Sequence, residues 1–179
     1  VTANDDDDPD TGPNGLQNFP VLAEAITGGG YLTVQGSLNS TADTTFRIEV
    51  YASTTGDAGG YGEGEEYLGG FNVTTDGSGD ISFIESLAAV VSVGDAITAT
   101  CTNLTTNETS EFSLNYSAAD NTDPTITSDG GGAIAAVDAA ENQTAVTTVT
   151  ATDSEVPPQT LVYSITGGAD AAFFSIDAD

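Results

Sequence analysis

Short runs of alternating apolar and polar residues predict β-strands along most of the chain. Around Phe46, Ile48 and Val50 the apolar side chains share one face of a strand, and the residues between them are polar. The segment around Cys101 alternates in the same way and places this thiol on the inward face. The pattern predicts strands near residues 20–26, 31–38, 45–53, 65–75, 80–87, 95–102 and 110–117.

Glycine-rich turn signals separate these strands, for example at residues 27–30, 56–60 and 76–79. Short strands at this density, in a stretch of roughly a hundred residues, are typical of an immunoglobulin-like β-sandwich. The sequence therefore predicts an all-β fold class with two immunoglobulin-like or cadherin-like sandwich units, of which the second is incomplete.

Composition divides the chain into four segments. Residues 1–18 form a head that is rich in Asp, Gly, Pro and Asn, and residues 19–118 carry the first sandwich. Residues 119–125 are predicted to be an acidic linker. Residues 126–179 resume the β pattern as a partial cadherin-like domain and stop without a closing signal.

The charge balance excludes several functions. The chain has 28 Asp plus Glu, one Lys or Arg and no His, which gives a formal net charge of −27. Such a chain offers no basic face to nucleic acid or to an anionic membrane surface, and no histidine for a Ser-His-Asp or Cys-His site. No apolar run reaches the ~20 residues of a membrane span, so we expect no membrane insertion.

The head has the composition of a calcium loop. Asp6, Asp8 and Asp10 alternate, Gly12 permits a bend, and Asn14 adds a neutral oxygen. This spacing is similar to the start of an EF-type or thrombospondin-type loop, without the bidentate Glu that closes an EF-hand. The alternative is a solvated acidic tail, because adjacent aspartates that bind nothing repel one another and stay disordered.

Residues 119–179 resemble the first half of a prokaryotic cadherin repeat. The resemblance is carried by residues 140–142, 149–155, 161–165 and 174–177. It implies a Ca²⁺ site that stiffens the domain junction, with ligands from the linker and from an Asp-X-Asp-like motif. The ligands it implies are Asp120, Asn121, Asp123, Asp153 and Glu155.

This sequence departs from the cadherin pattern at two points. Glu155 replaces the second Asp of the motif, and the linker is shorter than the family's usual form. The alternative interpretation of Asp153 and Glu155 is an exposed acidic turn.

Residues 1–117 resemble a module that follows parallel β-helices in large bacterial surface proteins. The resemblance is carried by residues 11–20, 60–69, 97–100 and 109–113. It implies an extracellular location and no known catalysis, so we expect a protein that is not an enzyme. A carboxylate glycosidase that uses Glu63, Glu65 or Glu66 is the enzymatic alternative, but it needs a sugar-sized cleft between two carboxyls.

Six sequons are compatible with an extracellular, glycosylated chain, although a sequence rich in Asn, Ser and Thr also produces sequons by chance. The candidate sites are Asn39, Asn72, Asn103, Asn107, Asn115 and Asn142. The acidity itself has two compatible explanations, which are bound Ca²⁺ and adaptation to high salt.

These features together predict an extracellular structural module of a cell-surface protein or filament, stiffened by Ca²⁺. The start of the chain has no Met, which suggests a mature segment of a longer precursor. The partial repeat has three explanations: order ends there, the segment is cut there, or a strand from a neighbouring copy completes it. Expected partners are other copies or adjoining domains; the alternative function is an adhesin or carbohydrate-binding module that uses Tyr61 and Tyr67 and binds glycans.

Overall fold

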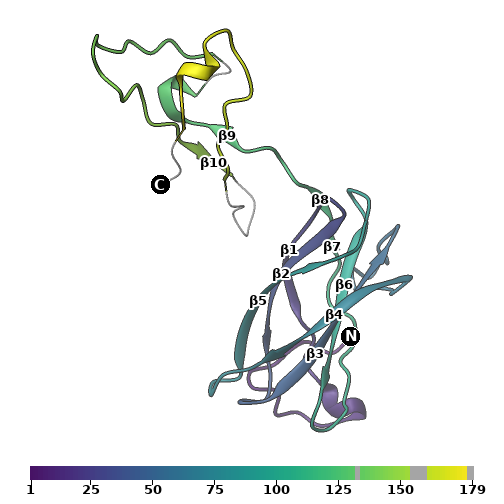
Figure 1. Cartoon of the computed structure of the whole chain (residues 1–179). Helices are drawn as coiled ribbons and strands as arrows, with labels where there is room; N and C mark the ends of the chain where they lie inside the picture. Colours follow the sequence, from purple (N-terminus) through teal and green to yellow (C-terminus); the bar gives the residue numbers. More distant parts are fainter. Residues whose placement is uncertain (132–133, 154–160, 177–179) are drawn as a thin grey trace. The chain divides into compact units, whose positions relative to one another are not determined.

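The chain forms two separate units, which we describe one at a time. The computed structural model describes residues 1–131, 134–153 and 161–176 (Figure 1). Unit 1 comprises Val1–Asn121 and unit 2 comprises Thr122–Asp179. The division falls inside the segment that the sequence predicts to be a linker.

Unit 1 is a β-sandwich of two four-stranded sheets. One sheet has the order β5-β2-β1-β8 and the other β4-β3-β6-β7. The neighbours within each sheet are antiparallel, except that β8 pairs with β1 in parallel. The strands are β1 (Val21–Gly28), β2 (Tyr31–Asn39), β3 (Thr45–Ser53), β4 (Glu66–Thr74), β5 (Asp80–Leu87), β6 (Ala96–Asn103), β7 (Tyr116–Ser117) and β8 (Ala119–Asp120).

The strand order matches an immunoglobulin-like sandwich. If β1, β2 and β5 are lettered A, B and E, and β3, β4, β6 and β7 are lettered C, C′, F and G, the sheets read E-B-A and C′-C-F-G. The all-β fold class is therefore confirmed. The six predicted strands from 20–26 to 95–102 are also confirmed, with ends that differ by no more than two residues.

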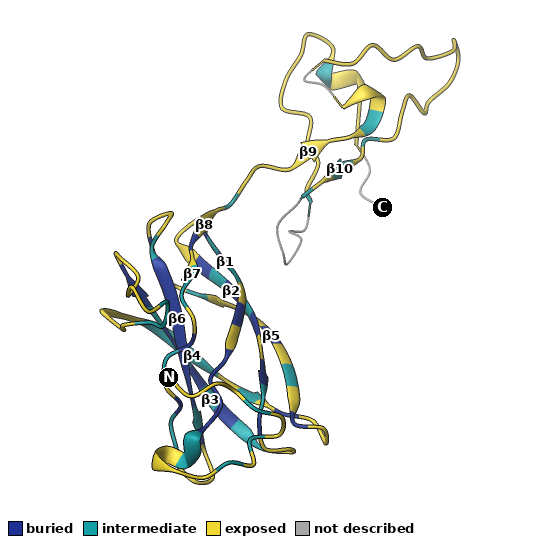
Figure 2. Ribbon diagram, turned by 180° about the vertical axis from the view of Figure 1, so that it is seen from behind, coloured by how far each residue is buried: buried dark blue, intermediate teal, exposed yellow. Residues whose placement is uncertain are grey.

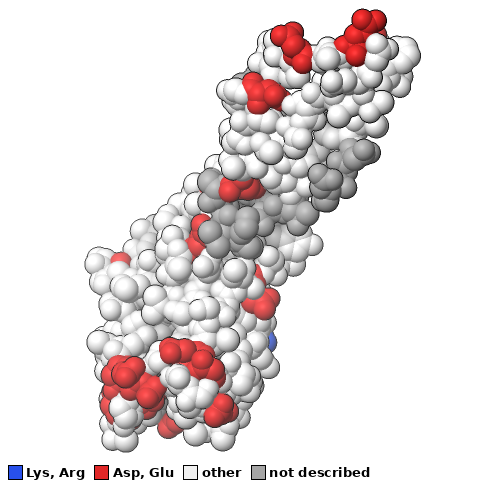
Figure 3. All heavy atoms as spheres, turned by 90° about the vertical axis from the view of Figure 1, so that its left-hand side faces the viewer, with Lys and Arg blue, Asp and Glu red and all other residues white. Residues whose placement is uncertain are grey.

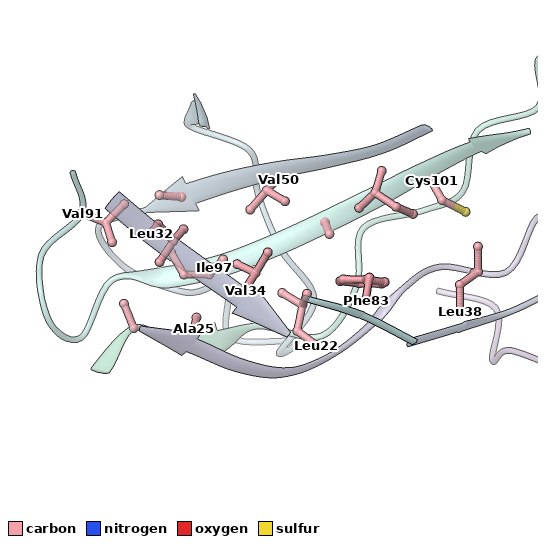
Figure 4. Close-up of a cluster of buried hydrophobic side chains, with 14 of the residues drawn as sticks. Leu22, Ala25, Leu32, Val34, Leu38, Val50, Phe83, Val91, Ile97 and Cys101 are labelled. Carbon is pink, nitrogen blue, oxygen red and sulfur yellow. The ribbon is translucent and has the colours of Figure 1, made fainter. Parts of the chain in front are cut away.

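The core lies between the two sheets and follows the alternation of the sequence. Phe46, Ile48 and Val50 of β3 are fully buried, and Cys101 of β6 is buried among the core residues as predicted. Figure 4 shows labelled side chains of both sheets pointing into the space between them. Burial raises the pKa of the Cys101 thiol to about 12, so this group stays protonated.

The predicted seventh strand at 110–117 is wrong in length. Only Tyr116–Ser117 forms a ladder with β6, next to the start of that strand. Further along, the hydroxyls of Ser110 and Ser113 accept hydrogen bonds from the Cys101 and Ala99 amides, at 3.0 Å each. Serine side chains thus replace backbone carbonyls as partners, and the segment does not continue as a regular strand.

Unit 2 has little regular structure among its described residues. Two short strands, β9 (Thr125–Ile126) and β10 (Ala151–Thr152), pair antiparallel. The short 3-10 turns η2 (Ser128–Gly130) and η3 (Ala171–Phe173) complete the assigned elements. The β pattern expected to resume over residues 126–179 forms no strand at its described end, because η3 ends at Phe173 and residues 174–176 form no ladder.

No described residue of unit 2 is buried, and most are exposed (Figure 2). The described part of the partial cadherin-like segment therefore consists of one β pair and connecting chain. It contains no second sheet that would cover an apolar face.

Candidate metal centre

The head is held against the sandwich of unit 1 by hydrogen bonds of two asparagine side chains. The Asn4 side chain makes two hydrogen bonds with the backbone of Phe19. It donates to the carbonyl at 2.7 Å and accepts from the amide at 2.9 Å. Asn18 pairs in the same way with the backbone of Asp5 and also donates to the carbonyl of Asn39 at 3.0 Å. The head therefore folds back on the sandwich beside the end of β2 and does not extend as a solvated tail.

Three half-buried carboxylates of the head form an acidic cluster, which consists of Asp5, Asp8 and Asp10. One oxygen from each lies within 4.8 Å of the others. The backbone is left-handed at Asp7 and Asp8, with φ of 62° and 57°, which turns the chain between the first and last members of the cluster. Like charges at this spacing repel one another unless a cation or a proton lies between them.

Asp8 is the best anchored member of the cluster. Its Oδ2 accepts hydrogen bonds from Ser40 Oγ and Gln17 Nε2, both at 2.6 Å, and its Oδ1 accepts from the Asn18 amide at 3.2 Å. Burial raises the pKa of Asp8, and the hydrogen bonds from Ser40 and Asn18 partly oppose that rise. The neighbouring carboxylates of Asp10 and Asp5 raise the pKa further.

The other two members each have an oxygen that needs a partner. Oδ1 of Asp5 and Oδ1 of Asp10 are buried and accept no hydrogen bond from the described residues. A buried carboxylate oxygen without a partner is costly, and a bound cation would remove that cost. An oxygen-only ligand set suits a hard cation such as Ca²⁺, which takes six to eight oxygens at ~2.3–2.6 Å.

The structure does not group the head aspartates as their alternation in the sequence predicts. It brings the predicted ligands Asp8 and Asp10 together with Asp5, whereas Asp6 is exposed and lies outside the cluster. Asn14 is exposed in η1 (Pro13–Leu16), and its carbonyl accepts a hydrogen bond from the Gln17 amide at 3.1 Å. Sequence spacing missed Asp5 because alternation assumes an extended loop, and this loop turns at residues 7 and 8.

The cluster borders an open cavity of about 320 Å³ that is lined mainly by residues with polar side chains. The head, the β2–β3 turn and the turn after β6 line it. Glu108 lies close by, since a Cβ placed on Gly15 would meet its carboxylate at 3.0 Å. The lining residues are Asp8, Asp10, Thr11, Gly15, Gln17, Thr41, Thr44, Asn103, Thr105, Thr106 and Glu108.

The ligands implied for the junction are divided between the two units. Asp120 lies exposed in β8, and the Asn121 amide donates to the Thr27 carbonyl at 3.1 Å, so both belong to unit 1. Asp123 and Asp153 belong to unit 2, and Glu155 lies outside the described residues. The junction site therefore stays a prediction.

The sequons fall into two groups by the state of their asparagine side chains. Asn72, Asn107 and Asn142 are exposed. Asn103 is buried and accepts hydrogen bonds from two turn amides, and Asn115 is half-buried. The side chain of Asn39 accepts from the Asp7 amide at 2.8 Å and donates to Asp80 at 2.9 Å.

The glutamates of the Gly60–Glu66 loop are exposed and show a structural role at one position. Glu65 accepts a hydrogen bond from the Thr54 amide at 3.0 Å. Glu63, Glu65 and Glu66 are not among the residues that line the cavity beside the acidic cluster. The nearby ring of Tyr67 is 51% exposed and lies 5.5 Å from that of Tyr51, edge to face.

Acidic side chains gather at the lower end of unit 1 in Figure 3, and the single Lys or Arg of the chain shows as a small blue patch at the right-hand edge, away from that end. A scan against protein-family models finds no match, and a search of curated proteins finds none either. Across the described residues, no helix is long and apolar enough to cross a membrane.

Proposed function

We propose that this chain is an extracellular structural module of a cell-surface protein or filament and is not an enzyme. The acidic cluster carries the proposal, because three half-buried carboxylates converge on one point and two of their buried oxygens accept no hydrogen bond in the described structure. Ca²⁺ bound there would neutralise their repulsion and fix the head to the sandwich.

The mechanical consequence follows from where the head attaches. Hydrogen bonds link it to Phe19 at the start of the sandwich and to Asn39 and Ser40 at the end of β2. A cation held by residues 5–10 would stabilise this attachment only when it is bound, since the apo cluster repels itself. The module would then respond to Ca²⁺ by stiffening at that end.

The second proposed Ca²⁺ site is the junction, with Asp120, Asn121 and Asp123 from the linker and Asp153 and Glu155 from the motif. It rests on the resemblance to cadherin repeats and on the acidity of these residues. Other copies of the chain, or adjoining domains of a longer surface protein, are the partners we propose.

An adhesin or carbohydrate-binding module is the second candidate function. Tyr67 favours it, because its ring is half exposed and its hydroxyl accepts a hydrogen bond from Arg47 at 3.3 Å. An exposed aromatic face beside a hydrogen-bond donor suits the apolar face and hydroxyls of a sugar. Binding to a glycan array that is lost in Tyr67→Ala would support this function over the structural one.

Thermal melting with millimolar Ca²⁺ and with EDTA tests the primary proposal. Ligand at about 100 times its Kd stabilises by ~2.7 kcal/mol, so we expect the Tm to rise by roughly 10 °C. The same samples viewed by negative-stain electron microscopy should show rods or filaments with Ca²⁺. An unchanged Tm together with isolated globules would contradict the proposal.

A further inference from the structure

Two buried polar side chains and one half-buried carboxylate meet where the head contacts the end of β2. Ser40 is fully buried and Gln17 is 6% exposed. Ser40 Oγ donates a hydrogen bond to Asp8 Oδ2 at 2.6 Å, and Gln17 Nε2 donates to the same oxygen at 2.6 Å. Gln17 Nε2 also donates to Ser40 Oγ at 2.8 Å, which closes a triangle of a hydroxyl, a carboxylate and a carboxamide.

These groups have the roles that acyl transfer requires. A serine hydroxyl is a nucleophile when a base accepts its proton, and a carboxylate in hydrogen-bond contact is such a base. A carboxamide is an acyl donor whose leaving group is its nitrogen. Here one carboxylate oxygen contacts both the attacking oxygen and the leaving nitrogen.

We propose that Ser40 Oγ and Gln17 Cδ form an intramolecular ester bond, with Asp8 as the proton carrier. Ser40 Oγ attacks Cδ while its proton passes to Asp8 Oδ2. The Cδ–Nε2 bond then breaks, Asp8 returns the proton to the departing nitrogen, and ammonia leaves. One O–H and one C–N bond are broken, one C–O and one N–H bond are made, and the carboxylate is regenerated without any co-reactant.

The surroundings favour both formation and persistence of the bond. The backbone of Ser40 is fixed because its amide donates to the Gly79 carbonyl at 2.9 Å, and a Cβ at Gly79 would clash with the Ser40 carbonyl. Holding the reacting groups in contact lowers the entropic cost of the reaction. Asp8 and Gln17 line the cavity, which gives ammonia a way out, and the burial of both Ser40 and Gln17 limits the access of water to the ester.

The ester would act as a covalent clasp between the head and the sandwich. It joins residues that are 23 positions apart and closes the chain across all of β1 and β2. Such a link stabilises a fold chiefly by restricting the unfolded chain, as a disulfide does. The reaction needs no cation. A chain in which the ester does not form would therefore leave the proposal for the acidic cluster untouched.

The intact mass of the purified chain tests this inference directly. Loss of ammonia lowers the mass by about 17 Da from the value that the sequence gives. A Glu-specific protease then localises the bond, because it cuts after Glu24, between the two linked residues. The peptide that ends at Glu24 and the peptide of residues 25–49 should stay joined, and mild alkali or hydroxylamine should separate them.

Variants distinguish this bond from other losses of ammonia. A succinimide at Asn14-Gly15 would give the same mass change, but it would survive Ser40→Ala and would not join the two peptides. We expect Ser40→Ala and Asp8→Asn to have the full mass, whereas the matched control Ser37→Ala, on the exposed face of β2, keeps the loss. An unmodified wild-type mass, or a loss that persists in Ser40→Ala, would overturn the inference, whatever the stability of the variants.

Discussion

The two units carry similar β patterns in sequence but differ in what their apolar side chains contact. In unit 1 the alternation of β3 places Phe46, Ile48 and Val50 against the facing sheet, and all three are fully buried. In unit 2 Ile134 is 92% exposed and Phe173 is 83% exposed. Alternation therefore specifies which face of a strand is apolar, whereas a core also requires a second sheet to cover that face.

The largest effect should come from a matched pair of phenylalanine substitutions. Phe46→Ala removes a fully buried ring from unit 1 and should lower its free energy of unfolding by about 3–5 kcal/mol. Phe173→Ala removes a mostly exposed ring from unit 2 and should change stability by less than ~0.5 kcal/mol. Urea unfolding followed by tyrosine fluorescence measures both, and equal effects would mean that unit 2 has a core of its own.

Calcium should discriminate between two aspartates of the head. Asp10→Asn removes a charge from the acidic cluster and should abolish most of the ~2–3 kcal/mol that saturating Ca²⁺ contributes. Asp6→Asn is the matched control, since Asp6 is exposed and lies outside the cluster. Thermal melting with Ca²⁺ and with EDTA gives both values. A larger loss in Asp6→Asn would favour the alternate spacing over the observed grouping.

The junction should show a smaller effect. Asp153→Ala should weaken Ca²⁺ binding and lower thermal stability by up to ~1 kcal/mol, because it removes one carboxylate from the ligand set that the cadherin resemblance implies. Isothermal titration calorimetry with Ca²⁺ measures the affinity, and Asp138→Ala in the same unit is the control for loss of a charge. If Asp153→Ala behaves like its control, the resemblance does not extend to this site.

The smallest effect is a pH dependence that arises from Asp8. Because burial raises its pKa in the folded state above the ordinary value of 3.8, the folded chain takes up this proton more readily than the unfolded chain. In EDTA, the contribution of Asp8 to stability should therefore improve as the pH falls from neutral through the folded-state pKa. The free energy of unfolding should depend less steeply on pH in Asp8→Asn than in the wild type, and urea unfolding at several pH values measures both. An equal dependence in the two chains would contradict this prediction.

How far the sequence predicts this molecule depends on whether a feature is local. Strands such as residues 45–53 follow from alternation and from the turns that bound them, and the structure confirms them. The segment 110–117 fails because Ser110 and Ser113 bond to the backbone of β6 with their side chains, which no periodicity reveals.

The candidate site shows the same limit. Asp8 and Asp10 were identifiable from composition, but the inclusion of Asp5 depends on a left-handed turn at residues 7 and 8. The contact of Gln17 with Ser40 joins positions on either side of two strands, so it becomes visible only once the sheet is formed.

Hydrogen exchange of the whole chain, with Ca²⁺ and with EDTA, tests the central claim most directly because it compares the two units in one experiment. The account predicts that Ca²⁺ slows exchange in residues 1–18 and at the Asn39 end of β2, where the head attaches. Within unit 2, residues 134–150 should exchange quickly in both conditions, since none of them is buried. Unchanged exchange in the head, or a slowing by Ca²⁺ confined to unit 2, would contradict a calcium-fixed head.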